Sequence, residues 1–123
     1  MRKARDRRRA YRFGLSAESA AAWWLRVKGY RILAQRFSVP VGEIDLIARR
    51  GATVCFVEVK ARRRPGQGLA AITPRQARRI ARAAEAFLQM RPDLGGCDIR
   101  FDAVVVTGLR PPVHLPDAWR PGG

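Results

Sequence analysis

The chain has 123 residues, and 25 lysines and arginines against 10 acidic residues give it a formal net charge of +15. This length accommodates one domain with a hydrophobic core but not two, and the charge predicts a polyanionic partner, chiefly nucleic acid. No apolar run approaches the roughly 18 residues of a membrane-spanning helix, and the basic N-terminus lacks the apolar segment of a secretory signal. We therefore expect a cytoplasmic protein with no membrane partner. Two distant cysteines and a single histidine argue against a disulfide framework and a Cys/His zinc site.

Residues 1–13 are predicted to form a basic N-terminal arm, with seven lysines and arginines and one acid. A block of like charge is either a solvated tail or an arm that binds nucleic acid. Residues 14–123 follow as a single domain. Its last segment, residues 108–123, is rich in proline and glycine, and its few large apolar residues predict that it packs across the domain or at an interface.

The first predicted helix covers residues 17–28. Trp24 and Val27 lie at helical spacing with other apolar residues and are expected on its buried face. Glu18 lies in the first turn, where the helix dipole favours an acid, and this alone accounts for its position. A strand is expected at residues 30–37.

Residues 42–48 and 53–60 are predicted to form a β-hairpin, because both runs have strand composition and a glycine lies between them. With a two-residue turn at 50–51, Asp45 lies opposite Phe56 in the antiparallel pair. This register fixes which side chains share a face of the hairpin.

Side-chain alternation then places Asp45, Glu58 and Lys60 on one face, while Leu46 and Val57 suit a core on the other. Neighbouring acids repel each other, and a divalent cation would resolve this conflict, because Mg²⁺ binds carboxylate oxygens together with water and phosphate oxygens. Lys60 would orient or activate a water molecule for phosphodiester hydrolysis. The alternative is a hairpin whose polar face is simply solvated and salt-bridged.

Basic residues dominate the next two segments. A glycine-containing loop after the hairpin suits contact with a DNA backbone. A helix follows from Pro74, capped by Thr73, to Met90. Opposite its apolar face it carries a row of arginines, whose mutual repulsion favours phosphate binding over an ordinary solvated face. The arginines of the loop and of the helix are Arg62, Arg63, Arg64, Arg75, Arg78, Arg79 and Arg82.

A last strand is predicted at residues 99–107. It places Asp102 among large apolar residues, and a buried acid needs a partner such as an arginine. The order helix, three strands, helix, strand predicts an α/β domain with a mixed sheet flanked by helices.

The hairpin also carries a resemblance. GEIDLIA at residues 42–48 followed by VCFVEVK at residues 54–60 resembles the central signature of the YraN-like family of small bacterial proteins. That family is grouped with the restriction-endonuclease-like, PD-(D/E)xK nucleases and is similar to archaeal-type Holliday junction resolvases. The resemblance extends from about Gly14 to Trp119 and implies a restriction-endonuclease-like sheet for the domain at 14–123.

The resemblance also implies roles for individual residues. Asp45 and Glu58 would be ligands of Mg²⁺ or Mn²⁺, with Glu18 of the first helix as a third, and Lys60 would be the catalytic lysine. The family usually has glycine where this chain has Ala17, which affects local packing but not the carboxylate. Gln76 would support the site from the second helix.

These observations predict a Mg²⁺-dependent endonuclease acting on branched or structured DNA. A homodimer follows from the resemblance alone, because resolvases cut two symmetric strands. Two alternatives remain: a non-catalytic nucleic-acid-binding protein that keeps the nuclease fold, and an assembly factor that binds nucleic-acid complexes through its basic surface.

Overall fold

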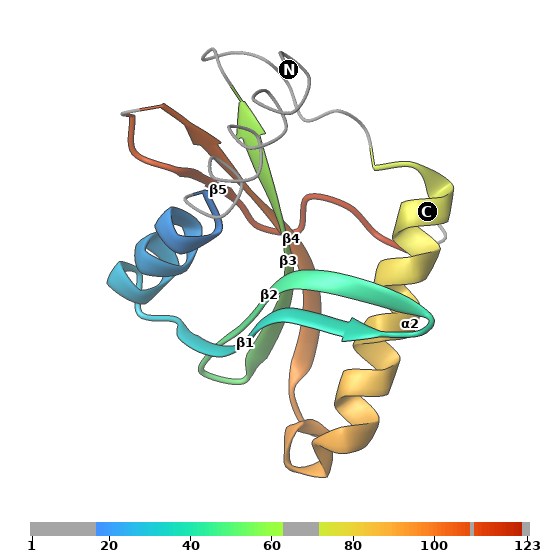
Figure 1. Cartoon of the computed structure of the whole chain (residues 1–123). Coiled ribbons are helices and arrows are strands. Elements are labelled where there is room, and N and C mark those ends of the chain that lie inside the picture. Colours follow the sequence, from blue (N-terminus) through green and yellow to red (C-terminus); the bar gives the residue numbers. More distant parts are fainter. Residues whose placement is uncertain (1–16, 63–71, 109, 122–123) are drawn as a thin grey trace.

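The computed structural model describes residues 17–62, 72–108 and 110–121. It has the predicted order of elements, with one short strand added near the C-terminus (Figure 1). Residues 17–27 are helical. The remaining elements are β1 (Arg31–Val39), β2 (Gly42–Arg50), β3 (Thr53–Arg62), α2 (Pro74–Met90), a 3-10 turn (Pro92–Leu94), β4 (Asp98–Thr107) and β5 (Val113–Leu115).

The five strands form one mixed sheet in the order β1-β2-β3-β4-β5. Neighbouring strands are antiparallel except β3 and β4, which are parallel because α2 returns the chain between them. This is an α/β fold consistent with the restriction-endonuclease-like sheet that was expected. Within the described residues, no helix is both long and apolar enough to cross a membrane.

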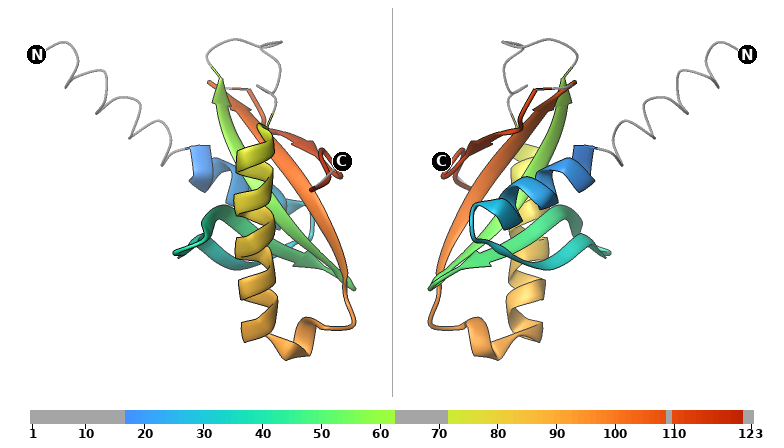
Figure 2. Two further views of the ribbon diagram at one scale, coloured as in Figure 1. Left: turned by 90° about the vertical axis from the view of Figure 1, so that its right-hand side faces the viewer. Right: turned by 90° about the vertical axis from the view of Figure 1, so that its left-hand side faces the viewer.

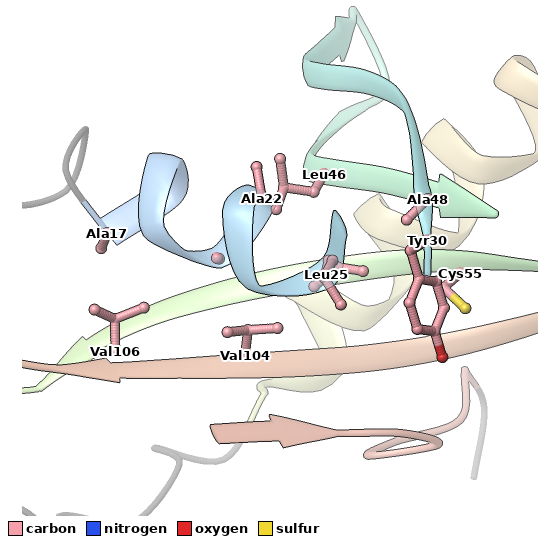
Figure 3. Close-up of a cluster of buried hydrophobic side chains, with 11 residues drawn as sticks. Ala17, Ala22, Leu25, Tyr30, Leu46, Ala48, Cys55, Val104 and Val106 are labelled. Atoms are coloured by element: carbon pink, nitrogen blue, oxygen red, sulfur yellow. The ribbon is translucent and has the colours of Figure 1, made fainter. Parts of the chain in front are cut away.

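Each face of the sheet is covered by one helix. Figure 2 shows α2 running along one face and the helix at 17–27 lying across the other. The first core lies between that helix and the sheet, where Leu25 packs with Leu46, Cys55 and Val104 (Figure 3). The second lies under α2, around Phe56 and the other residues of that cluster. The hairpin of β2 and β3 therefore contributes to both cores.

The buried face of the first helix differs from the predicted one by a rotation of about one residue. Ala17, Ala21 and Leu25 are buried, whereas Val27 is 59% exposed. Trp24 is only half-buried. Small alanines face the sheet because they let the helix backbone approach it closely, and the larger side chains are displaced toward its margins.

The hairpin register differs from the prediction by two residues. Arg50 pairs with Thr53, so the turn lies at residues 51–52, and Ile47 rather than Asp45 lies opposite Phe56. Gly51 has a φ of +59°, which explains a glycine in this turn. Because side chains alternate with a period of two, a shift by two residues leaves the same side chains on the same face.

The start of β2 is pressed against α2. A Cβ atom at Gly42 would lie 2.1 Å from the carbonyl oxygen of Arg79, so only glycine allows this approach. The helix itself begins as predicted, with a capping box in which Thr73 and Gln76 bond reciprocally. These two features fix the first turns of α2 over the start of β2.

The C-terminal tail packs onto the domain as expected. Residues of β5 pair with β4, and Trp119 contacts Phe101 with ring centroids 4.7 Å apart. The predicted N-terminal arm at 1–13 and the loop residues Arg63 and Arg64 lie outside the described residues.

Candidate metal-binding active site

A small hollow lies between the β2–β3 hairpin and the first turns of α2. It has a volume of about 100 Å³, and we call it the acidic hollow. Three carboxylates from the hairpin form one side, and α2 forms the other. Its lining residues are Glu43, Asp45, Glu58, Gln76, Arg79 and Ile80.

Asp45 is fixed where the two strands of the hairpin separate. The pairing of β2 with β3 ends at Leu46 and Val57. Beyond this point the backbone N–H of Val59 donates to Oδ2 of Asp45 at 2.8 Å. The carboxylate thus takes the place of a main-chain carbonyl in the ladder, which holds it in one orientation.

The environment of Asp45 opposes its negative charge. Burial, followed by the charge of Glu58 and, more weakly, that of Glu18, raises the pKa of Asp45 from 3.8 to about 7. The hydrogen bond from Val59 acts in the opposite direction but is outweighed. A cation between these carboxylates would remove both causes of the rise, since it replaces lost hydration and neutralises their repulsion.

Glu58 and Lys60 lie together on the same side of β3. Their side chains form an ion pair with Nζ 3.2 Å from Oε1, and each is less than a fifth exposed. The structure thus brings Asp45, Glu58 and Lys60 together, as the alternation along the hairpin predicted. The same ion pair is also what a salt-bridged polar face would contain.

Glu18 lies near the hollow but does not line it. Its Oε2 accepts a hydrogen bond from Nε of Arg36 at 2.7 Å. Arg36 has a φ of +52° inside β1, an unusual conformation for a side-chain-bearing residue. Although three carboxylates line the hollow, in the part of the chain that the structure describes no three acidic, histidine or cysteine side chains are grouped closely enough to hold one metal ion. Glu18, the predicted third metal ligand, is thus paired with Arg36 in this structure.

The predicted residues of α2 divide into two groups. Gln76 and Arg79 line the hollow, although Oε1 of Gln76 also accepts from the N–H of Thr73 in the helix cap. Arg75, Arg78 and Arg82 are exposed and do not line it. Arg62 lies at the end of β3, where Nη1 donates to the carbonyl oxygen of Ala61.

One charged lining residue was missed by sequence reasoning. Glu43 faces the acidic hollow, but it was not proposed as a site residue. The signal was available in the spacing, because Glu43 and Asp45 are two positions apart on one strand and therefore project to the same side.

Asp102 belongs to a separate, structural network. It is completely buried, and both of its oxygens accept from Arg100 at 2.8 Å. His114 contacts Oδ2 at 2.8 Å, and the N–H of Asp117 donates to Oδ1. Burial alone would raise the pKa of Asp102, but the bonds from Arg100 and His114 hold it below its usual value. The expectation that a buried acid needs an arginine partner is confirmed.

Comparisons with known proteins place the chain in one family. The model of the uncharacterised protein family UPF0102 matches residues 17–106. A UPF0102 protein of Rhodopseudomonas palustris (strain HaA2) is 53% identical over 114 residues, covering 93% of this chain and 89% of the relative. Another from Paramagnetospirillum magneticum is 52% identical over 115 residues, covering 90% and 89%. The chain therefore belongs to the UPF0102 family, the YraN-like family that its hairpin resembles.

Proposed function

We propose that this protein is a Mg²⁺-dependent endonuclease that hydrolyses phosphodiester bonds in structured DNA. The observation that carries the proposal is the placement of Asp45 and Glu58 side by side in a hollow that Arg79 also lines, where burial and the charge of Glu58 raise the pKa of Asp45. Two repelling carboxylates in such a place are costly for a purely structural role, and they suit a cation. The preference for branched DNA follows from the resemblance to junction resolvases.

The donor set fits Mg²⁺ or Mn²⁺. Both are hard cations that take oxygen ligands, and Mg²⁺ commonly uses one or two carboxylates together with water and phosphate oxygens. Asp45 and Glu58 would supply those carboxylates, with Glu18 joining if it exchanges Arg36 for the cation. The bound cation would polarise the phosphate and lower the pKa of a coordinated water.

The protein side chains would perform the remaining tasks. Arg79 lines the hollow and would pair with a non-bridging phosphate oxygen. Lys60, beside Glu58, would orient the attacking water. In the reaction the oxygen of a water molecule bonds to phosphorus and gives up a proton to the solvent, the ester bond to the leaving oxygen breaks, and that oxygen gains a proton.

The test is a cleavage assay over branched, flapped, single-stranded and duplex DNA with Mg²⁺ or Mn²⁺. Lys60→Ala should lower cleavage by roughly 10²–10⁴-fold, the typical contribution of a positioned acid–base group, and should leave DNA binding intact. Asp45→Asn should lose metal affinity and cleavage together. Asp98→Asn removes an exposed acid of β4 and is the matched control. Cleavage by Lys60→Ala at the parental rate would contradict the role proposed for Lys60.

A second candidate function is non-catalytic nucleic-acid binding. It is favoured by the two ion pairs that already engage Glu18 and Glu58, because these satisfy the carboxylates without a metal. In that case Asp45→Asn should bind DNA like the parent, and neither protein should cleave any of the four substrates.

A further inference from the structure

A second hollow lies at the other end of the hairpin, and arginines dominate it. It has a volume of about 440 Å³ and is open to solvent. We call it the arginine hollow. Its lining residues are Gly29, Arg31, Arg49, Arg50 and Gly51. Neither Arg31, Arg49 nor Arg50 belongs to the basic loop or to the arginine row of α2.

The placement of these arginines is unfavourable without an anion. Arg31 and Arg49 are directly opposite each other in the pairing of β1 with β2, where like charges repel. Across the described residues, none of the three arginines forms an ion pair. Asp93 is near enough to interact with Arg49 electrostatically, but two nitrogens of Arg91 bind its carboxylate.

Two of the guanidinium groups are held in place. Nε of Arg49 donates to the carbonyl oxygen of Gly51 at 2.9 Å. The guanidinium of Arg50 lies over the ring of Tyr30, 4.9 Å from its centroid, and Nη1 donates to the carbonyl oxygen of Lys28 at 3.3 Å. Prior fixation reduces the entropy lost when an arginine binds an anion.

The glycines keep the space between the arginines open. Gly29 has a φ of +92° and Gly51 a φ of +59°, so both positions need the conformational freedom of glycine. Neither residue projects a side chain into the hollow. A tetrahedral anion can therefore approach the guanidinium groups without meeting a side chain at either glycine.

We propose that the arginine hollow binds a backbone phosphate of nucleic acid, away from the site of hydrolysis. This inference rests on the proposed function in one respect, that both hollows contact the same DNA. Asp45 and Arg49 are four positions apart on β2, which at about 3.3 Å per residue is roughly 13 Å. Phosphates along one strand are about 3.4 Å apart in axial rise, so roughly four nucleotides span this distance.

Binding measurements on the full chain test the proposal without requiring cleavage. Affinity for a labelled duplex and a four-way junction is measured in EDTA over a series of salt concentrations. Arg31→Gln/Arg49→Gln should reduce the slope of log affinity against log salt by about 1, since the loss of one phosphate contact removes about 0.9. The control, Arg91→Gln/Arg120→Gln, removes two arginines that are already ion-paired, and it should keep the parental slope. Circular dichroism confirms that all variants are folded.

The outcomes distinguish this inference from the proposed function. If the slope falls only in the Arg31/Arg49 variant, the phosphate site is supported, even when no protein cleaves DNA. An equal fall in the control variant attributes the effect to bulk charge and overturns the site. If the slope of the Arg31/Arg49 variant is unchanged, the proposed phosphate site is overturned. If the parent nevertheless cleaves DNA, the nuclease proposal is unaffected by this result. Binding of polyglutamate is measured in parallel. If the Arg31/Arg49 variant loses it while its binding to DNA is unchanged, the hollow binds an acidic peptide and the proposed phosphate site is overturned.

Discussion

Asp45→Asn measures how strongly the acidic hollow opposes folding when no cation is present. The substitution removes the negative charge but keeps an oxygen that can accept the hydrogen bond from Val59. Its effect on stability should therefore be electrostatic and should depend on pH. We expect the asparagine variant to be more stable than the parent at high pH, although the substitution removes a proposed metal ligand.

The magnitude follows from the pKa of Asp45, which rises from 3.8 to about 7 on folding. At about 1.4 kcal/mol per pH unit this corresponds to at most about 4 kcal/mol, and we expect about half, because the carboxylate is not fully buried. A raised pKa means that the folded state holds the proton more tightly. Its contribution to stability is complete below about pH 4 and is lost as the pH rises through about 7.

The assay is urea unfolding at pH 4.5 and at pH 8 in EDTA, followed by tryptophan fluorescence. The gain of the variant over the parent should be about 2 kcal/mol larger at pH 8 than at pH 4.5. Asp98→Asn, which neutralises an exposed acid, should show no such difference. Replacing EDTA with Mg²⁺ at pH 8 should stabilise the parent, by about 2.7 kcal/mol at a free concentration 100 times the dissociation constant, but not the variant.

Two results would refute this reasoning. The first is an Asp45→Asn variant whose difference from the parent is the same at both pH values, since the charge of Asp45 then costs nothing. The second is equal stabilisation of parent and variant by Mg²⁺, since the cation then binds elsewhere.

Two further substitutions test the packing around the site. Gly42→Ala should lower the free energy of unfolding by about 1–3 kcal/mol or more, because its Cβ would lie 2.1 Å from the carbonyl oxygen of Arg79. It should also weaken metal binding. Urea unfolding measures the change, and Gly96→Ala, whose Cβ would meet nothing within 4 Å, is the control. Asp102→Asn should cost about 3–5 kcal/mol by leaving Arg100 without its buried partner. The pKa of Asp102 is lowered on folding, so the stability that its charge supplies should be lost as the pH falls, and the variant should show less acid sensitivity than the parent.

Local chemistry made much of the fold predictable. The turn glycine, the Thr73-Pro74 helix start and the β-branched runs each favour one local structure, and all three appear where expected. Alternation along the hairpin was sufficient to place Asp45, Glu58 and Lys60 together. That conclusion survived an error of two residues in register, because such a shift does not change the face.

The remaining features depend on contacts between distant segments. The ion pair of Glu18 with Arg36 joins the first helix to β1, and no local pattern indicates it. The close approach of Gly42 to α2 is also set by the packing of the sheet against the helix. Similarly, β5 is too short for a periodic signal and exists because β4 offers it an edge.

The acidic pair has a consequence for the kinetics of folding. Asp45 and Glu58 lie on adjacent strands of one hairpin, so a short loop brings them together. Hairpins of this kind form early, because closing a short loop costs little entropy. Burial, the main cause of the raised pKa, requires α2 to pack over the hairpin and is completed later. The charge of Asp45 should therefore destabilise the protein mainly after the transition state for folding. Neutralising Asp45 should then slow unfolding more than it speeds folding.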